Sequence, residues 1–162
     1  MRFQPLNNLE TWQVISLIIF GLILCYLSFV DFKKLSINGW DLTLIGTYTA
    51  VNFLIHIQRF GIGYLFDGIK ALLLSVTFFS IVIIVTRRNG IGFGDMLFFG
   101  IASINVGFTN AFEALIFAFS IGAIVALILI TTGKLNFKER TPFIPFLSFG
   151  ICLSLFLDFV YI

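Results

Sequence analysis

Residues 90–100 read GIGFGDMLFFG, in which four glycines surround a single acid, Asp95. The acid stands at the point where the chain becomes strongly apolar again. A carboxylate at membrane depth is costly, by about 2.5–3.5 kcal/mol at the centre of an inserted helix and by less near its ends, and is usually paired or functional. The stretch therefore predicts the start of a hydrophobic helix and, at that start, a candidate functional acid.

The composition of the whole chain places this helix in a membrane. The chain has 162 residues, of which 59% are hydrophobic and only 11% charged, whereas soluble domains carry about 25% charged residues. A soluble domain of this length buries only about 70% of its unfolded surface, so it could not hide that much apolar area. We expect one integral-membrane domain covering residues 1–162. Its net charge of +2 is too small to indicate nucleic acid as a partner, whereas membrane lipids are an expected one.

Six apolar segments are separated by polar breaks, which predicts an all-α, polytopic membrane protein with six transmembrane helices. About 20 apolar residues are needed to cross the hydrocarbon core. The fourth segment has only about 13 residues, or about 20 Å of helix, and is expected to be short. It is separated from the fifth by Thr109 and Asn110. The segments cover residues 11–30, 42–57, 64–86, 96–108, 111–132 and 142–162.

The basic residues give these segments an orientation. They concentrate in the first, third and fifth breaks, and the positive-inside rule places such breaks in the cytoplasm. Both termini are then expected outside the cell membrane, with Asp31 and Asp95 together on its cytoplasmic side. The basic residues concerned are Lys33, Lys34, Arg87, Arg88, Lys134, Lys138 and Arg140.

Asp31 and Asp95 each have a structural interpretation beside the functional one. An interfacial Asp31 would pair with Lys33 or Lys34. Asp95 would serve as a first-turn acid at the positive end of a helix, which is the role that we expect for Asp41. Two acids on one membrane face, each beside a distinctive stretch of sequence, instead favour a function that uses both.

Two carboxylates held close together share one proton, and the resulting apparent pKa values belong to the pair. One of them then draws a proton from water while the other donates to the scissile carbonyl, as in aspartic proteases. The sequence holds no HExxH, nucleophile elbow or phosphate loop that would indicate another chemistry. We expect no cofactor or metal: His56 is interpreted as an interfacial or satisfied polar residue, and Cys25 and Cys152 as buried core residues.

The glycines before Asp95 fit the same chemistry. Gly90, Gly92 and Gly94 lack a Cβ, so each allows a positive φ and the close approach of another chain. A peptide substrate in extended form can pair with such a loop, which brings its backbone near the acids. A flexible turn would explain some of these glycines, but not the acid that follows them.

Together these residues resemble the type IV prepilin peptidases and the related preflagellin peptidases. These are polytopic GxGD aspartic proteases of the cytoplasmic membrane face. Their GxGD motif corresponds to Gly92-Phe93-Gly94-Asp95. Their other acid lies in a stretch that corresponds to VDFKKLSINGW at residues 30–40, where Asp31 matches the acid and Lys33 the basic residue that follows it.

The resemblance extends over essentially the whole chain. The stretch TPFIPFLSFG, residues 141–150, is similar to the family's final helix, with Pro145, Phe146 and Gly150 at matching positions. Two positions depart from the family pattern: Asn38 replaces a proline, and Leu97 replaces a lysine two residues after the second acid. The long cysteine-bearing cytoplasmic domain of bifunctional members is absent from the first break.

The resemblance implies a membrane-embedded aspartic endopeptidase with Asp31 and Asp95 as catalytic residues. Gly90, Gly92, Gly94 and Lys33 would position the loop and the substrate. Its partners would be prepilin or pseudopilin precursors of a type IV pilus, competence or secretion system, cleaved at the cytoplasmic membrane face. No N-methyltransferase activity is expected, because that activity is associated with the missing domain.

Two other functions are compatible with the same residues. A small ion-coupled transporter would use the acids to bind a proton or a cation, because broken helices with polar residues are also typical of transporters. A catalytically inactive assembly scaffold would account for the departures at Asn38 and Leu97.

Overall fold

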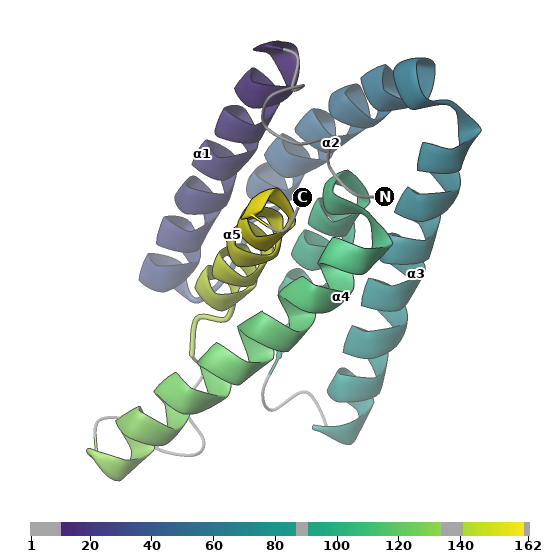
Figure 1. Cartoon of the computed structure of the whole chain (residues 1–162). Helices are drawn as coiled ribbons and strands as arrows, with labels where there is room; N and C mark the ends of the chain where they lie inside the picture. Colours follow the sequence, from purple (N-terminus) through teal and green to yellow (C-terminus); the bar gives the residue numbers. More distant parts are fainter. Residues whose placement is uncertain (1–10, 87–90, 134–140, 161–162) are drawn as a thin grey trace.

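Long runs of apolar residues form helices, because a helix satisfies its own backbone hydrogen bonds where water is excluded. A computed structural model describes residues 11–86, 91–133 and 141–160, and every regular element within these ranges is an α-helix (Figure 1). The predicted all-α class is confirmed. In chain order the helices are α1 (Thr11–Lys34), α2 (Gly39–Phe60), α3 (Ile62–Val85), α4 (Phe93–Thr131) and α5 (Ile144–Val160).

The prediction of six transmembrane helices is not supported. Among the described residues, three helices are long and apolar enough to cross a membrane, namely α1, α3 and α4. Helix α2 is continuous, but its sequence contains polar residues that include Asn52, His56 and Arg59. Helix α5 is apolar but has only 17 residues. The length and composition of the described helices therefore support three candidate spans and not six.

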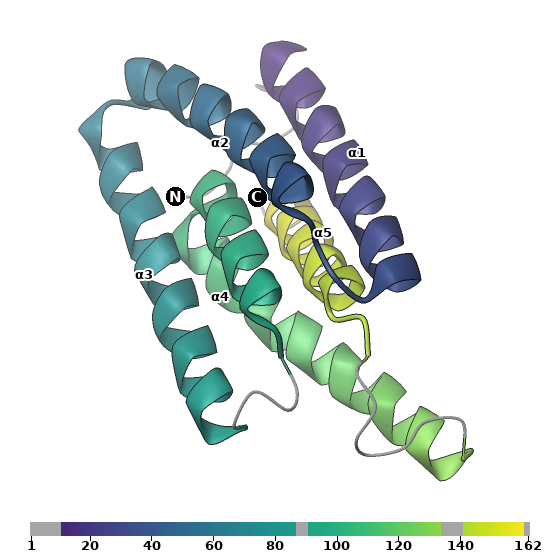
Figure 2. The same ribbon diagram turned by 180° about the vertical axis from the view of Figure 1, so that it is seen from behind.

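The expected fourth and fifth segments lie in one helix, α4, which is broken at Gly107 (φ 80°, ψ 173°). Figures 1 and 2 show that the chain reverses its direction here, so that the first arm of α4 runs beside α3 and the second arm runs back past α5. The break between the two segments was expected at Thr109 and Asn110 and lies just before them, at Gly107. A backbone with positive φ favours glycine over these polar residues.

The surroundings of Gly107 leave little room for a side chain. A Cβ at this position would lie 2.5 Å from Oδ2 of Asp67, the end of a side chain on α3 that would have to shift. Gly107 is therefore favoured chiefly by its backbone conformation. This one residue makes the first arm of α4 short.

Residues in left-handed conformations also form two of the connections between helices. Leu35 ends α1 with φ 51°, and its N–H donates to the carbonyl oxygen of Asp31 at 2.8 Å. Gly61, with φ 76°, is the single residue between α2 and α3. Such short connections fix the directions in which α2 and α3 leave their neighbours.

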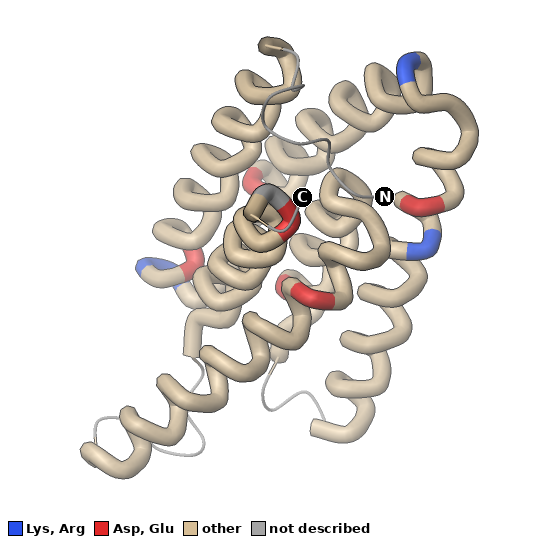
Figure 3. The backbone as a smooth tube through the Cα atoms, viewed as in Figure 1, with Lys and Arg blue, Asp and Glu red and all other residues tan. Residues whose placement is uncertain are grey.

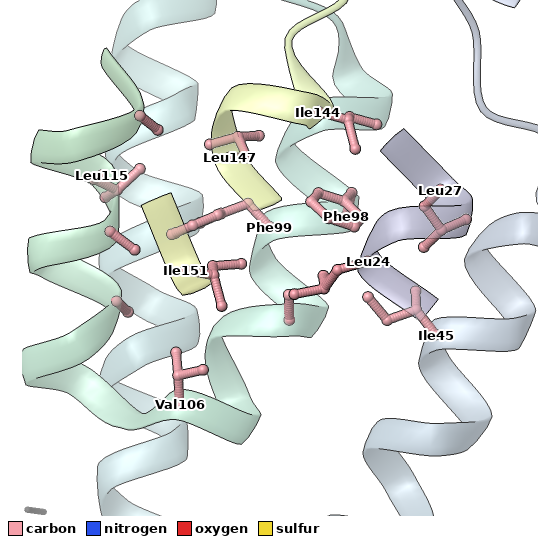
Figure 4. Packing of buried hydrophobic residues seen from close by; sticks show 14 of the residues in the cluster. Leu24, Leu27, Ile45, Phe98, Phe99, Val106, Leu115, Ile144, Leu147 and Ile151 are labelled. Carbon is pink, nitrogen blue, oxygen red and sulfur yellow. The ribbon is translucent and has the colours of Figure 1, made fainter. Parts of the chain in front are cut away.

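Side chains from all five helices form one hydrophobic core (Figure 4). Helix α4 packs against α2, α3 and α5, and the side chains at these contacts are almost completely buried. This packing holds the C-terminal end of α1 close to the N-terminal ends of α4 and α5. The most deeply buried large side chains are Leu24, Leu27, Ile45, Phe79, Phe98, Phe99, Ile144, Leu147 and Ile151.

The outer surface of the bundle is apolar along most of its length. Figure 3 shows long stretches of helix without a charged residue, and leucine, isoleucine and phenylalanine side chains face outward on every helix. Cys25 and Cys152 belong to this surface: both are free and exposed, so the prediction that they are core residues was wrong. Apolar surroundings in sequence do not indicate burial when the outward face of a helix is also apolar.

Candidate functional site

A pocket of about 230 Å³ lies where three connecting segments meet. Figure 2 shows the segments after α1, before α4 and before α5 gathered at the same end of the bundle. The pocket contains both predicted acids, Asp31 and Asp95, although they lie on helices that are far apart in sequence. Its lining consists of Asp31, Leu35, Ser36, Ile37, Ile91, Gly92, Phe93, Gly94, Asp95, Thr141, Phe143 and Ile144.

Asp31 lies in the last turns of α1 and is only 5% exposed. Its Oδ2 accepts a hydrogen bond from the backbone N–H of Ile144, the first residue of α5, at 3.1 Å. The positive end of a helix stabilises a carboxylate, so α5 compensates in part for the burial of this acid. An interfacial Asp31 paired with a lysine is therefore not the arrangement observed, because Asp31 is buried and bound to α5.

Asp95 is the third residue of α4, and its Oδ2 accepts the backbone N–H of Gly92 at 2.8 Å. This is the first-turn role that its structural interpretation predicted. Asp41 has the same place in α2, where its Oδ2 accepts the N–H of Asn38 at 3.1 Å. Asp95 and Asp41 therefore have the same capping role. They differ in location, because Asp95 lines the pocket with Asp31 and Asp41 does not.

The glycines before Asp95 contribute space more than unusual backbone geometry. Gly92 has φ −84° and ψ 158°, an extended conformation that other residues also adopt, so the expected positive φ is not found there. No atom lies within 4 Å of the position of a Cβ at Gly94, which therefore borders the open pocket. Gly90 lies outside the described residues.

Lys33, the predicted positioning residue, lies away from the pocket. Its Nζ is 4.4 Å from the centre of the Phe29 ring, one turn earlier on the same helix, and both side chains are exposed. Lysine can extend along an apolar surface in this way while its ammonium group reaches a polar environment. The geometry thus connects Lys33 with the surface of α1 and not with the two acids.

The two departures from the family pattern have different structural settings. Asn38 begins α2, and its N–H is the donor to Asp41 that a proline would lack. Leu97 is 36% exposed on α4 and does not line the pocket. Neither substitution removes a side chain from the pocket lining.

The segment before α5 contributes to the pocket in a way that was not predicted. Thr141, Phe143 and Ile144 line the pocket, and Ile144 holds Asp31 through its backbone. The available signal was the pair Pro142 and Pro145, since prolines cluster at helix starts. A backbone donor leaves no trace in side-chain chemistry, which is why motif reasoning missed it.

A second, smaller cavity of about 20 Å³ lies among polar side chains of α1, α2 and α4. Ser16 Oγ donates to Asn52 Oδ1 at 2.8 Å, Asn52 Nδ2 to Asn105 Oδ1 at 3.1 Å, and Asn105 Nδ2 to Thr49 Oγ1 at 2.7 Å. These bonds connect three helices through the interior. His56 is buried beside them, with Nδ1 2.8 Å from the Asn52 carbonyl oxygen, which fits a satisfied polar residue.

The pocket offers two carboxyl groups, each held by a backbone N–H, and an apolar wall. Such a site can orient an uncharged peptide group and exchange protons with it. Within the described ranges, no group of three or more His, Cys, Asp or Glu side chains is arranged to hold a metal ion.

Comparison of the chain with models of protein families, with curated proteins and with solved structures finds no match. The resemblance to prepilin peptidases therefore rests on the motifs in the sequence.

Proposed function

We propose that this protein is a membrane-embedded aspartic endopeptidase that removes the leader peptide from prepilin-like or pseudopilin-like precursors. One observation carries the proposal: Asp31 and Asp95, from helices distant in sequence, line the same pocket. Two carboxylates in one pocket are the minimum apparatus for hydrolysis without a covalent intermediate. The motifs around both acids in the sequence support the same activity.

In this mechanism one carboxylate takes a proton from a water molecule, which attacks the scissile carbonyl carbon. The other acid donates its proton to the carbonyl oxygen, which gives a tetrahedral diol. As the C–N bond breaks, the first acid passes the proton from water to the leaving amine nitrogen, and the second takes a proton back from a diol hydroxyl group as the new carboxyl group forms. The open side of Gly94 accommodates the extended substrate backbone. The apolar wall formed by Ile37, Ile91 and Phe93 limits water around the reacting groups.

The proposed location follows from the distribution of basic residues. The pocket would face the cytoplasm, with both termini on the other side of the membrane. A precursor anchored by its own apolar helix would then present the leader at the pocket from the cytoplasmic side. N-methylation of the cleaved product is not part of the proposed activity.

The test uses the purified protein in lipid nanodiscs with candidate precursors, and loss of the leader is followed by mass spectrometry. We expect Asp31→Asn and Asp95→Asn each to lower the cleavage rate by about 10²–10⁴-fold, the usual contribution of an acid–base group. Both variants keep an oxygen that can accept the backbone hydrogen bonds described above. Cleavage at the wild-type rate by either variant would contradict the proposal.

Asp41→Asn is the matched control for these variants. Asp41 occupies the same position in its helix as Asp95 and accepts the same kind of hydrogen bond, but it lies outside the pocket. Its replacement should leave cleavage within a few-fold of the wild type. An equal loss of cleavage rate in all three variants would indicate that the substitutions damage the fold, and not that Asp31 and Asp95 are catalytic.

A small ion-coupled transporter is the second candidate function. It is favoured by the break in α4 at Gly107 and by the buried polar side chains of Asn52 and Asn105 nearby, because broken helices and buried polar groups are common at transport sites. Uptake by proteoliposomes without cleavage of any precursor would support it. An inactive scaffold would instead leave both Asp→Asn variants indistinguishable from wild type in cells.

A further inference from the structure

The first turn of α5 has one backbone donor that the helix does not use. Initial N–H groups of a helix lack partners within it. Here the N–H groups of Phe146 and Leu147 both donate to the carbonyl oxygen of Phe143, at 3.1 and 3.2 Å. The N–H of Ile144 donates instead to Asp31, across the boundary between α5 and α1.

The sequence makes this donor specific. Pro145 follows it and has no N–H, so it cannot compete for the carboxylate. Proline also fixes φ near the helical value at the start of a helix. Asp31 therefore receives the N–H of Ile144, together with a backbone hydrogen bond from the preceding residue, Phe143.

The position of this donor depends on how α5 packs against the second arm of α4. Gly150 lies against α4 so closely that a Cβ would overlap the carbonyl oxygen of Ala114 and lie 3.1 Å from the amide nitrogen of Ala118. Leu147 and Ile151, on the same helix, are fully buried. Helix α5 thus cannot move toward α4, and a larger residue at 150 would push the whole helix outward.

We propose that the first turn of α5 is a working part of the site, in which the Ile144 amide orients the carboxyl group of Asp31 and Gly150 sets the position of that amide. This inference rests on the proposed peptidase function. The bond from Ile144 to Oδ2 fixes the orientation of the Asp31 carboxyl group at the pocket. Ile144 and Gly150 are then positioning residues, since neither reacts with the substrate.

The contact itself is tested without any enzyme assay. Exchange of the Ile144 amide hydrogen is measured by NMR in nanodiscs, with the buried α4 residue Ala102 as the reference for global unfolding. We expect Asp31→Ala to accelerate exchange at Ile144 by at least about tenfold, since the acceptor is lost. Asp95→Ala should leave it unchanged. An unchanged rate in Asp31→Ala would overturn the inference.

The positioning role is tested by a pair of variants at residue 144. Ile144→Ala and Ile144→Pro both remove the buried side chain, but only the proline variant also removes the N–H, and proline is accepted in the first turn of a helix. We expect kcat for Ile144→Pro to be at least about tenfold below that of Ile144→Ala, with similar KM values. Equal kcat values would overturn the positioning role.

Gly150→Ala provides the second measurement, because it displaces α5 without removing any side chain of the pocket. It should lower kcat and accelerate exchange at Ile144, whereas Gly21→Ala, which meets no atom within 4 Å, should change neither. Normal exchange and normal kcat in Gly150→Ala would refute its role. If the wild-type protein cleaves no precursor, the proposed function fails, and the exchange measurements still decide whether α5 holds Asp31.

Discussion

Replacing Gly107, in α4, with alanine should destabilise the protein more than a Gly→Ala change in α1 or α2. The backbone at this position combines φ 80° with ψ 173°, which is accessible almost only to glycine. Holding alanine there costs about 1–3 kcal/mol. The new Cβ would also lie 2.5 Å from Oδ2 of Asp67, and overpacking of this kind costs about 1–3 kcal/mol.

Two effects reduce this cost only slightly. Alanine restricts the unfolded chain more than glycine does, which contributes about 0.4–1 kcal/mol in favour of folding. Straightening α4 would remove the strain, but a continuous helix of 39 residues would be about 58 Å long, against about 30 Å for a hydrocarbon core. The net loss in free energy of unfolding is therefore about 1–5.6 kcal/mol.

The assay is reversible unfolding in mixed micelles, followed by circular dichroism, for Gly107→Ala, Asp67→Ala and the double variant. Removing the Asp67 side chain should recover the steric part of the loss, about 1–3 kcal/mol, but not the backbone part. Gly21→Ala is the control, since its Cβ would meet no atom within 4 Å. If Gly107→Ala is as stable as Gly21→Ala, the break at Gly107 is not required by the fold and this reasoning is refuted.

Two further predictions concern the pocket and the polar interior. Gly94→Ala should leave the unfolding midpoint unchanged or raise it, because alanine is favoured in a helix by about 0.5–1 kcal/mol. It should nevertheless slow precursor cleavage at least about tenfold, because its Cβ enters the open pocket beside Asp95. Unimpaired cleavage by a stable variant would show that the substrate does not pass Gly94. Asn105→Leu should lower the free energy of unfolding by about 1–3 kcal/mol, because it leaves the buried Asn52 amide without its acceptor. The same unfolding assay measures this change. A stability equal to that of the wild type would mean that the hydrogen bond between these amides does not stabilise the fold.

The helices were predictable because their signals are local. Uninterrupted apolar runs and the polar stretches around Asn38 and Gly92 mark where helices begin, and the structure begins helices just after both residues. The number of membrane spans was not predictable in the same way. Gly107 has no sequence signal that separates it from Gly100, which lies inside the helix, because the difference arises from how α3 approaches the chain.

The same distinction applies to the candidate site. Asp31 and Asp95 were identifiable because a carboxylate beside an apolar segment is unusual in any membrane protein. Lys33 was assigned to the site from its place in a motif, but its side chain lies along α1, where apolar stems of lysine are stable. Ile144 was not assigned, because its contribution is a backbone N–H, which every residue except proline has.

The two acids share a structural principle that connects the fold with the proposed chemistry. Asp31 and Asp95 each bind a backbone N–H at the start of a helix, Asp31 that of α5 and Asp95 that of α4. Each carboxylate therefore lies beside the positive end of a helix, which offsets part of the cost of placing an acid in an apolar protein. A pocket built where helices begin can thus hold two acids in an apolar protein without a basic side chain in its described lining. This arrangement also predicts that rearranging either helix start would alter the acids, whereas changes at the lipid-facing surface would not.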